Sequence, residues 1–129
     1  MDRFQTPIKR VSGLGSAKDG THHWWVQRTS AMALAVLTPW FIWRCASTPA
    51  DFASVRDMVG LPYNALLLSA FIVALFYHAQ LGLQVVVEDY IHSRPAEVAL
   101  LLAIKVFAWL GAGAALLAIL FQVFVRLNS

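Results

Sequence analysis

The chain contains very little cysteine and few charged residues for its length. Its single cysteine, Cys45, excludes an internal disulfide, and it also excludes zinc or iron–sulfur sites that need several thiolates. Charged residues make up 13% of the 129 residues, whereas 59% are hydrophobic and the mean hydropathy is +0.63. A soluble domain of this size needs a polar surface that such a sequence cannot supply, so we expect an integral membrane protein.

The excess of basic residues does not indicate nucleic-acid binding. The formal net charge is +3, but half of the Lys and Arg residues precede the first apolar run and form no patch interleaved with aromatic residues. We interpret them as topology signals, because only Arg44 and Arg56 lie between the first and second apolar runs. This predicts an N-terminus on the cytoplasmic side of a bacterial inner membrane, or on the matrix side in a mitochondrion, and a C-terminus on the opposite side.

Three apolar stretches, separated by short polar connections, predict an all-α bundle of three transmembrane helices. The expected spans are residues 23–46, 64–91 and 96–126. Together they form one membrane domain over residues 23–127, and the polar residues 1–22 are expected to form an arm on the cytoplasmic or matrix side. The uncharged core of the first span, Thr29–Trp43, is short, but arginine and tryptophan at both of its ends extend it.

One histidine, His78, lies within a long run of residues without charge, 58–87. An ionisable side chain at membrane depth is costly and therefore indicates a functional site, and imidazole is a common axial ligand of haem iron. At 100° per residue, Gly82 and Asp89 share the helix face of His78, with Asp89 roughly 16 Å away along the axis. Gly82 would leave room for a flat macrocycle one turn from the imidazole.

The same residues also have plain structural interpretations, which the sequence leaves open. A lone histidine in a membrane is often a hydrogen-bonding residue between helices. Tyr90 and Arg28 are of the types that anchor a helix end at the membrane surface, and Lys105 is expected to extend to the cytoplasmic face. His78 and Asp89 could form a proton path or packing contacts without any cofactor. The combination of these residues, rather than any one of them, favours redox chemistry.

Two stretches resemble the hydrophobic membrane anchor subunit of succinate dehydrogenase (respiratory complex II). They are HHWWVQRTSA at 22–31 and HAQLGLQVVVEDY at 78–90. The similarity in length and topology covers nearly the whole chain, although the N-terminal arm and the connection 47–62 match nothing diagnostic. The resemblance implies a subunit that is packed with a cytochrome b membrane subunit. This pair would dock a flavoprotein and an iron–sulfur subunit, and the chain would have no activity alone.

The resemblance also implies two groups of ligand-binding residues. A haem b would lie between the two membrane subunits, with His78 as one axial ligand of the iron, Gly82 packed against the macrocycle and Arg28 near the propionates and the quinone pocket. Tyr90 would bind ubiquinone, and Asp89 would support the hydrogen-bond and proton network beside it. The roles of the two adjacent histidines at 22 and 23 stay open, and either would join this network.

The complex implied by the resemblance oxidises succinate in the tricarboxylic acid cycle and passes electrons to ubiquinone. The sequence does not separate this from the anchor of a quinol:fumarate reductase, which runs the reverse reaction. It also does not show whether the quinone is ubiquinone or menaquinone, or whether the four-subunit complex forms a trimer. A free-standing cytochrome is disfavoured, because the chain offers only one histidine at membrane depth.

Overall fold

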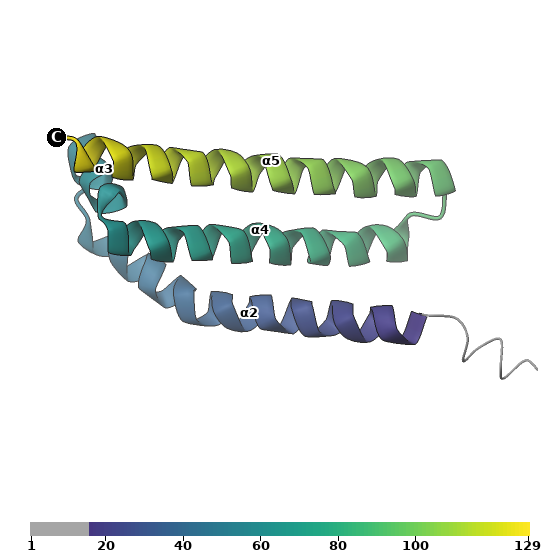
Figure 1. The fold of residues 1–129 in the computed structure, drawn as a ribbon. Helices are drawn as coiled ribbons and strands as arrows, with labels where there is room; N and C mark the ends of the chain where they lie inside the picture. The colour runs from purple at the N-terminus through teal and green to yellow at the C-terminus, as the bar shows by residue number, and fades with distance from the viewer. Residues whose placement is uncertain (1–15) are drawn as a thin grey trace, which may run out of the picture.

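The computed structural model describes residues 16–129, with side chains described from residue 20 onward. This part of the chain forms four helices, which are α2 (Ser16–Ser47), α3 (Phe52–Gly60), α4 (Pro62–Tyr90) and α5 (Arg94–Leu127). The three long helices run side by side with α4 in the middle, and the short α3 lies at the end where the chain terminates (Figure 1). No strand occurs within the described range, so the all-α expectation is confirmed there.

Two of the four helices, α4 and α5, are long and apolar enough to cross a membrane. They correspond to the predicted spans 64–91 and 96–126. The predicted first span, 23–46, lies in α2. This helix has 32 residues but is not apolar enough over the length needed to cross a membrane. The reason is the short uncharged core, Thr29–Trp43, which is flanked by arginine on both sides. The described residues therefore supply two candidate spans, and the predicted count of three is not confirmed.

The first long helix begins earlier than the sequence predicts. α2 starts at Ser16, so residues 16–22 of the predicted arm are helical and continue directly into the expected first span. Polarity alone does not end a helix, because the backbone hydrogen bonds continue whether a side chain faces water or lipid. Residues 1–15 of the predicted arm lie outside the described residues.

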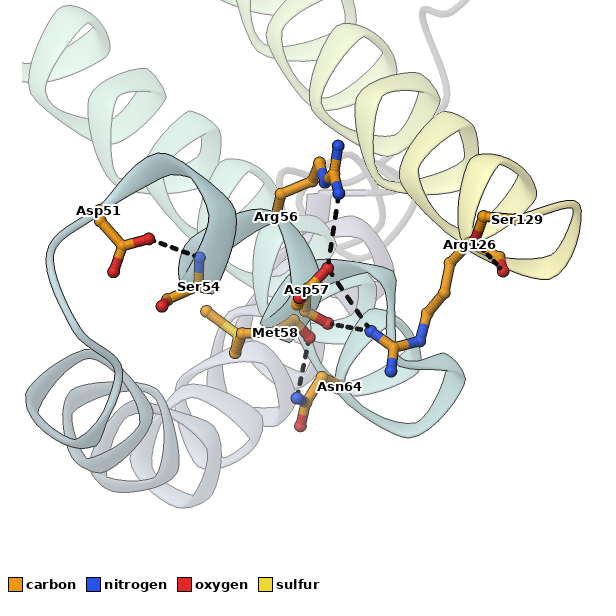
Figure 2. Close-up of polar contacts among 8 residues, drawn as sticks. All are labelled: Asp51, Ser54, Arg56, Asp57, Met58, Asn64, Arg126 and Ser129. Atoms are coloured by element: carbon orange, nitrogen blue, oxygen red, sulfur yellow. Dashed lines mark hydrogen bonds and ion pairs between the residues drawn. The ribbon is translucent and has the colours of Figure 1, made fainter.

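The predicted connection 47–62 contains the helix α3, which the sequence analysis does not predict. Asp51 precedes α3, and its carboxylate accepts a hydrogen bond from the backbone N–H of Ser54 at 2.9 Å (Figure 2). This is the usual arrangement at a helix N-terminus. The hydrogen bonds from Ser54 hold the pKa of Asp51 below its ordinary value.

The C-terminal end of α3 is held by side chains from both α4 and α5. The buried Asn64 side chain of α4 donates to the Met58 carbonyl at 2.9 Å, and Arg126 of α5 donates to the Asp57 carbonyl at 2.9 Å (Figure 2). The last carbonyls of a helix lack partners within the helix, so these bonds satisfy groups that would otherwise need water. Contacts to α4 and α5 therefore stabilise α3 as much as its own sequence does.

The central helix α4 packs closely against both neighbours. On the α2 side, the rings of Phe41 and Phe71 stack with their centroids 4.6 Å apart. On the α5 side, Gly111 lies beneath the ring of Phe76, where an added Cβ would come within 2.6 Å of a ring carbon. A small residue at this position lets the two helix backbones approach each other.

We expect Gly111→Ala to loosen the α4–α5 contact, because the Phe76 ring has to move to admit the methyl group. Overpacking of this kind costs about 1–3 kcal/mol. Gly113→Ala is the matched control, since its added Cβ would meet no atom within 4 Å. Both variants gain the same helix propensity, so the difference between their melting temperatures in one detergent, followed by circular dichroism, isolates the clash. Equal melting temperatures would contradict the close contact.

Candidate functional site

One face of α2 packs against α4, and we call this contact the α2–α4 seam. Its α2 residues are buried or half-buried and recur every three or four positions: His23, Gln27, Ser30, Leu34, Leu37 and Phe41. That spacing places them on a single helix face. His78 of α4 makes a polar contact with this face, and its Nδ1 lies 3.1 Å from the Ser30 hydroxyl oxygen.

The imidazole of His78 is half-buried, and only one of its two nitrogens contacts Ser30. Nδ1 is engaged by Ser30, whereas Nε2 has no hydrogen-bond partner within the part of the chain that the structure describes. Imidazole nitrogens bind metals through a free lone pair, and a hydrogen bond at the other nitrogen commonly sets which one is free. The geometry therefore suits ligation through Nε2.

His78 lines an open groove of about 480 Å³ beside the seam. The α2 wall of this groove consists of Trp24, Gln27, Arg28, Ala31, Met32 and Ala35. Its volume lies within the range of roughly 300–1,000 Å³ that is common for ligand sites. The Arg28 guanidinium lies 5.3 Å from the centre of the Trp24 ring, an arrangement that holds a permanent cation beside the groove. An imidazole and a guanidinium thus share one open space.

The other predicted site residues lie elsewhere on α4. At Gly82, one turn from His78, an added Cβ would meet no atom within 4 Å, so space is open there. Asp89 and Tyr90 are exposed at the C-terminal end of α4, and 75% of the Tyr90 surface is accessible. Neither lines the groove of His78 and Arg28. The structure therefore brings His78 and Arg28 together and places the acidic and aromatic pair on a separate surface near the α4–α5 turn.

The two adjacent histidines, which the sequence does not distinguish, have different surroundings. His22 is exposed and lines a second, apolar groove of about 780 Å³, whose α4 wall includes Ser69 and Tyr77. His23 lies on the α2–α4 seam, and its Nε2 is buried without a hydrogen-bond partner in the described range. Of the two, only His23 lies on the α2–α4 seam, whereas His22 lines the second groove, which Ser30 also borders.

No group of three His, Cys, Asp or Glu side chains that could hold a metal ion occurs among the described residues. A bare metal ion would need such a group, whereas the iron of a haem takes four ligands from the macrocycle and requires only axial donors from protein. The single imidazole of His78 at an open groove suits haem iron rather than a bare metal ion. The missing wall and the second axial donor would have to come from another chain.

The family comparison and the comparison with curated proteins identify the same family. The chain matches the family described as succinate dehydrogenase/fumarate reductase transmembrane subunit over residues 2–112. A succinate dehydrogenase hydrophobic membrane anchor subunit from Rickettsia bellii is 32% identical over 120 residues, which cover 92% of this chain and 96% of that protein. The subunit of the same name from Paracoccus denitrificans is 32% identical over 118 residues, or 91% of each chain. No solved structure gives a match.

Proposed function

The chain belongs to the succinate dehydrogenase/fumarate reductase transmembrane subunit family, and we propose that it is the membrane anchor of a succinate:quinone oxidoreductase. It is a membrane-embedded subunit with two apolar helices long enough to cross a bilayer. In the proposed complex it docks a flavoprotein and an iron–sulfur subunit, which oxidise succinate. The names of its relatives, which are succinate dehydrogenase anchors, favour this direction over fumarate reduction.

Large apolar surfaces on the helices support partners within the membrane. Ile119 is the only buried residue of α5, whereas 79% of Phe107 and 68% of Trp109 are exposed. Surfaces of this extent on a soluble monomer would drive association. In the complex they face lipid and a second membrane subunit of the cytochrome b type. α2 supplies the third span, with Arg28 and Arg44 each packed against a tryptophan ring near its two ends.

The orientation follows from the arrangement of the helix ends. The N-terminal part of α2 and the α4–α5 turn lie at one end of the bundle, and the C-terminus lies at the other (Figure 1). The basic residues that precede the first apolar run favour the cytoplasmic or matrix side for the first end. Tyr90 and Asp89 then lie near that side, in a bacterial or mitochondrial inner membrane.

His78 and Arg28 supply one half of a haem b site in this proposal. His78 would hold the haem iron through an imidazole nitrogen, and the second membrane subunit would supply a further ligand. The Arg28 guanidinium would pair with the propionates, while Gly82 leaves room beside the helix. When bound, haem b supplies one-electron transfer, and the protein sets its position and potential.

Tyr90 and Asp89 form this chain's part of a ubiquinone site. Reduction of a quinone takes up two protons, so its carbonyl oxygens need a hydrogen-bond donor and an acidic group that water can reach. The exposed Tyr90 hydroxyl can donate to a carbonyl oxygen, and the exposed Asp89 carboxylate can relay protons from water. On the same helix end, the Gln84 amide donates to the Glu88 carboxylate at 2.8 Å and extends the polar surface.

The anchor role rests on the family match, and the haem site rests on one observation: His78 and Arg28 line the same open groove. The test of both is to purify the chain from membranes with a C-terminal affinity tag and to identify the proteins that accompany it. A reduced-minus-oxidised absorption spectrum is recorded on the same sample. We expect a flavoprotein, an iron–sulfur protein and a second membrane subunit, together with b-type bands. Absence of the flavoprotein would contradict the anchor role, whereas a full complex without b-type bands would leave a purely structural anchor.

A further inference from the structure

We propose that Ser30 is a positioning residue that fixes the tautomer and the orientation of the His78 ring, an inference that rests on the proposed haem site. The Ser30 hydroxyl oxygen lies 3.1 Å from His78 Nδ1. These two residues are 48 positions apart in sequence and belong to different helices. Ser30 therefore links α2 directly to the candidate iron ligand on α4.

The direction of this hydrogen bond follows from the other contact of Ser30. The hydroxyl also lies 2.9 Å from the backbone carbonyl of Gln27, which can only accept a hydrogen bond. A serine hydroxyl has one hydrogen and two lone pairs. When that hydrogen is donated to Gln27, the hydroxyl oxygen can only accept from His78, so the proton is carried by Nδ1. Nε2 is then unprotonated and has a lone pair for iron.

The surroundings of Ser30 make this arrangement rigid. Only 8% of the Ser30 surface is exposed, so little water competes for its hydroxyl. The bond to Gln27 lies within one turn of α2, which ties the hydroxyl to the helix backbone. The imidazole is consequently oriented by α2, and its position depends on the α2–α4 seam.

The hydrogen bond should also influence the iron. Donation from Nδ1–H to an acceptor makes the imidazole a more basic ligand. A more basic ligand stabilises ferric over ferrous iron and so lowers the midpoint potential of the haem. Ser30→Ala removes the acceptor and leaves Nδ1–H without a partner on α2. We therefore expect the potential to rise in this variant and haem retention to fall.

The test compares three variants of the assembled complex by redox titration of the b-type absorption. Ser30→Ala should reduce the preference for ferric over ferrous haem by up to about tenfold, which corresponds to an upward shift of up to about 59 mV for one electron. Ser30→Thr keeps a hydroxyl and should restore the wild-type potential. Thr29→Val is the matched control and should leave the potential unchanged. It removes the neighbouring hydroxyl, which within the described part of the chain donates only to the Trp25 carbonyl of its own helix.

The outcomes separate this inference from the haem site itself. An unchanged or lowered potential in Ser30→Ala, with haem lost in His78→Ala, would overturn the role of Ser30 and leave the haem site standing. Equal haem in the wild type and in His78→Ala would instead overturn the site. If Ser30→Ala does not assemble, Ser30→Thr is compared with Ser30→Cys, whose thiol is a weak acceptor. Equal potentials in those two variants would contradict the proposal.

Discussion

Replacing His78 by alanine should remove the b-type absorption from the assembled complex. Among the residues that the structure describes, His78 is the only imidazole that lines the groove beside Arg28, and alanine offers no donor to iron. Loss of a group that merely supports a metal ligand already costs about 10–100-fold in affinity, so loss of the ligand should lower the haem content by more than tenfold. The measurement is haem per mole of purified complex, determined by pyridine haemochrome absorbance.

His92→Ala is the control for this experiment. His92 is exposed after the end of α4, where its Nδ1 lies 3.2 Å from the Tyr90 carbonyl, and it does not line the groove. The variant should retain a full complement of haem. A normal haem content in His78→Ala would place the axial ligand on another residue or another chain.

Tyr90→Phe should slow quinone reduction while leaving succinate oxidation intact. The substitution keeps the exposed ring and removes only the hydroxyl that we assign to a quinone carbonyl. Removal of one hydrogen-bond donor from a developing oxyanion typically costs about 10²-fold in rate. The two activities are measured on one preparation, with a soluble ubiquinone analogue and with an artificial dye that accepts electrons before the membrane site.

Tyr63→Phe serves as the matched control for Tyr90→Phe. Tyr63 is also exposed on α4, but it lies at the opposite end of the helix, edge-on to Trp40 with centroids 6.4 Å apart. We expect normal activity with both acceptors. An equal loss of dye and quinone activity in Tyr90→Phe would indicate faulty assembly, and an equal quinone defect in both variants would argue against a site at Tyr90.

The two most apolar helices could be predicted from the sequence to within two residues at each end. The long apolar runs set their extent, and Pro62 and Pro95 mark their starts, because proline suits the first turn of a helix. α3 could not be predicted in the same way. Its C-terminal carbonyls are satisfied by Asn64 and Arg126, and Arg126 lies 69 residues from its partner Asp57.

The candidate site was predictable only in part. His78 stands out because an ionisable residue is rare at membrane depth, and Arg28 stands out as a cation at the end of an apolar run. Ser30 carries no such signal, since serine is ordinary in packed membrane helices. Its contact with His78 depends on the register of α2 against α4, which no local pattern fixes. The same register separates the surroundings of His22 and His23.

The most direct test of the central claim is an experimental structure of the complete complex in lipid. Our account predicts a haem in the groove beside the α2–α4 seam, with its iron coordinated by His78 Nε2 and by an imidazole of the second membrane subunit. It also predicts the Arg28 guanidinium next to the propionates. A His78 ring that packs against lipid, or a groove filled by side chains of the second subunit with no porphyrin beside it, would contradict the account.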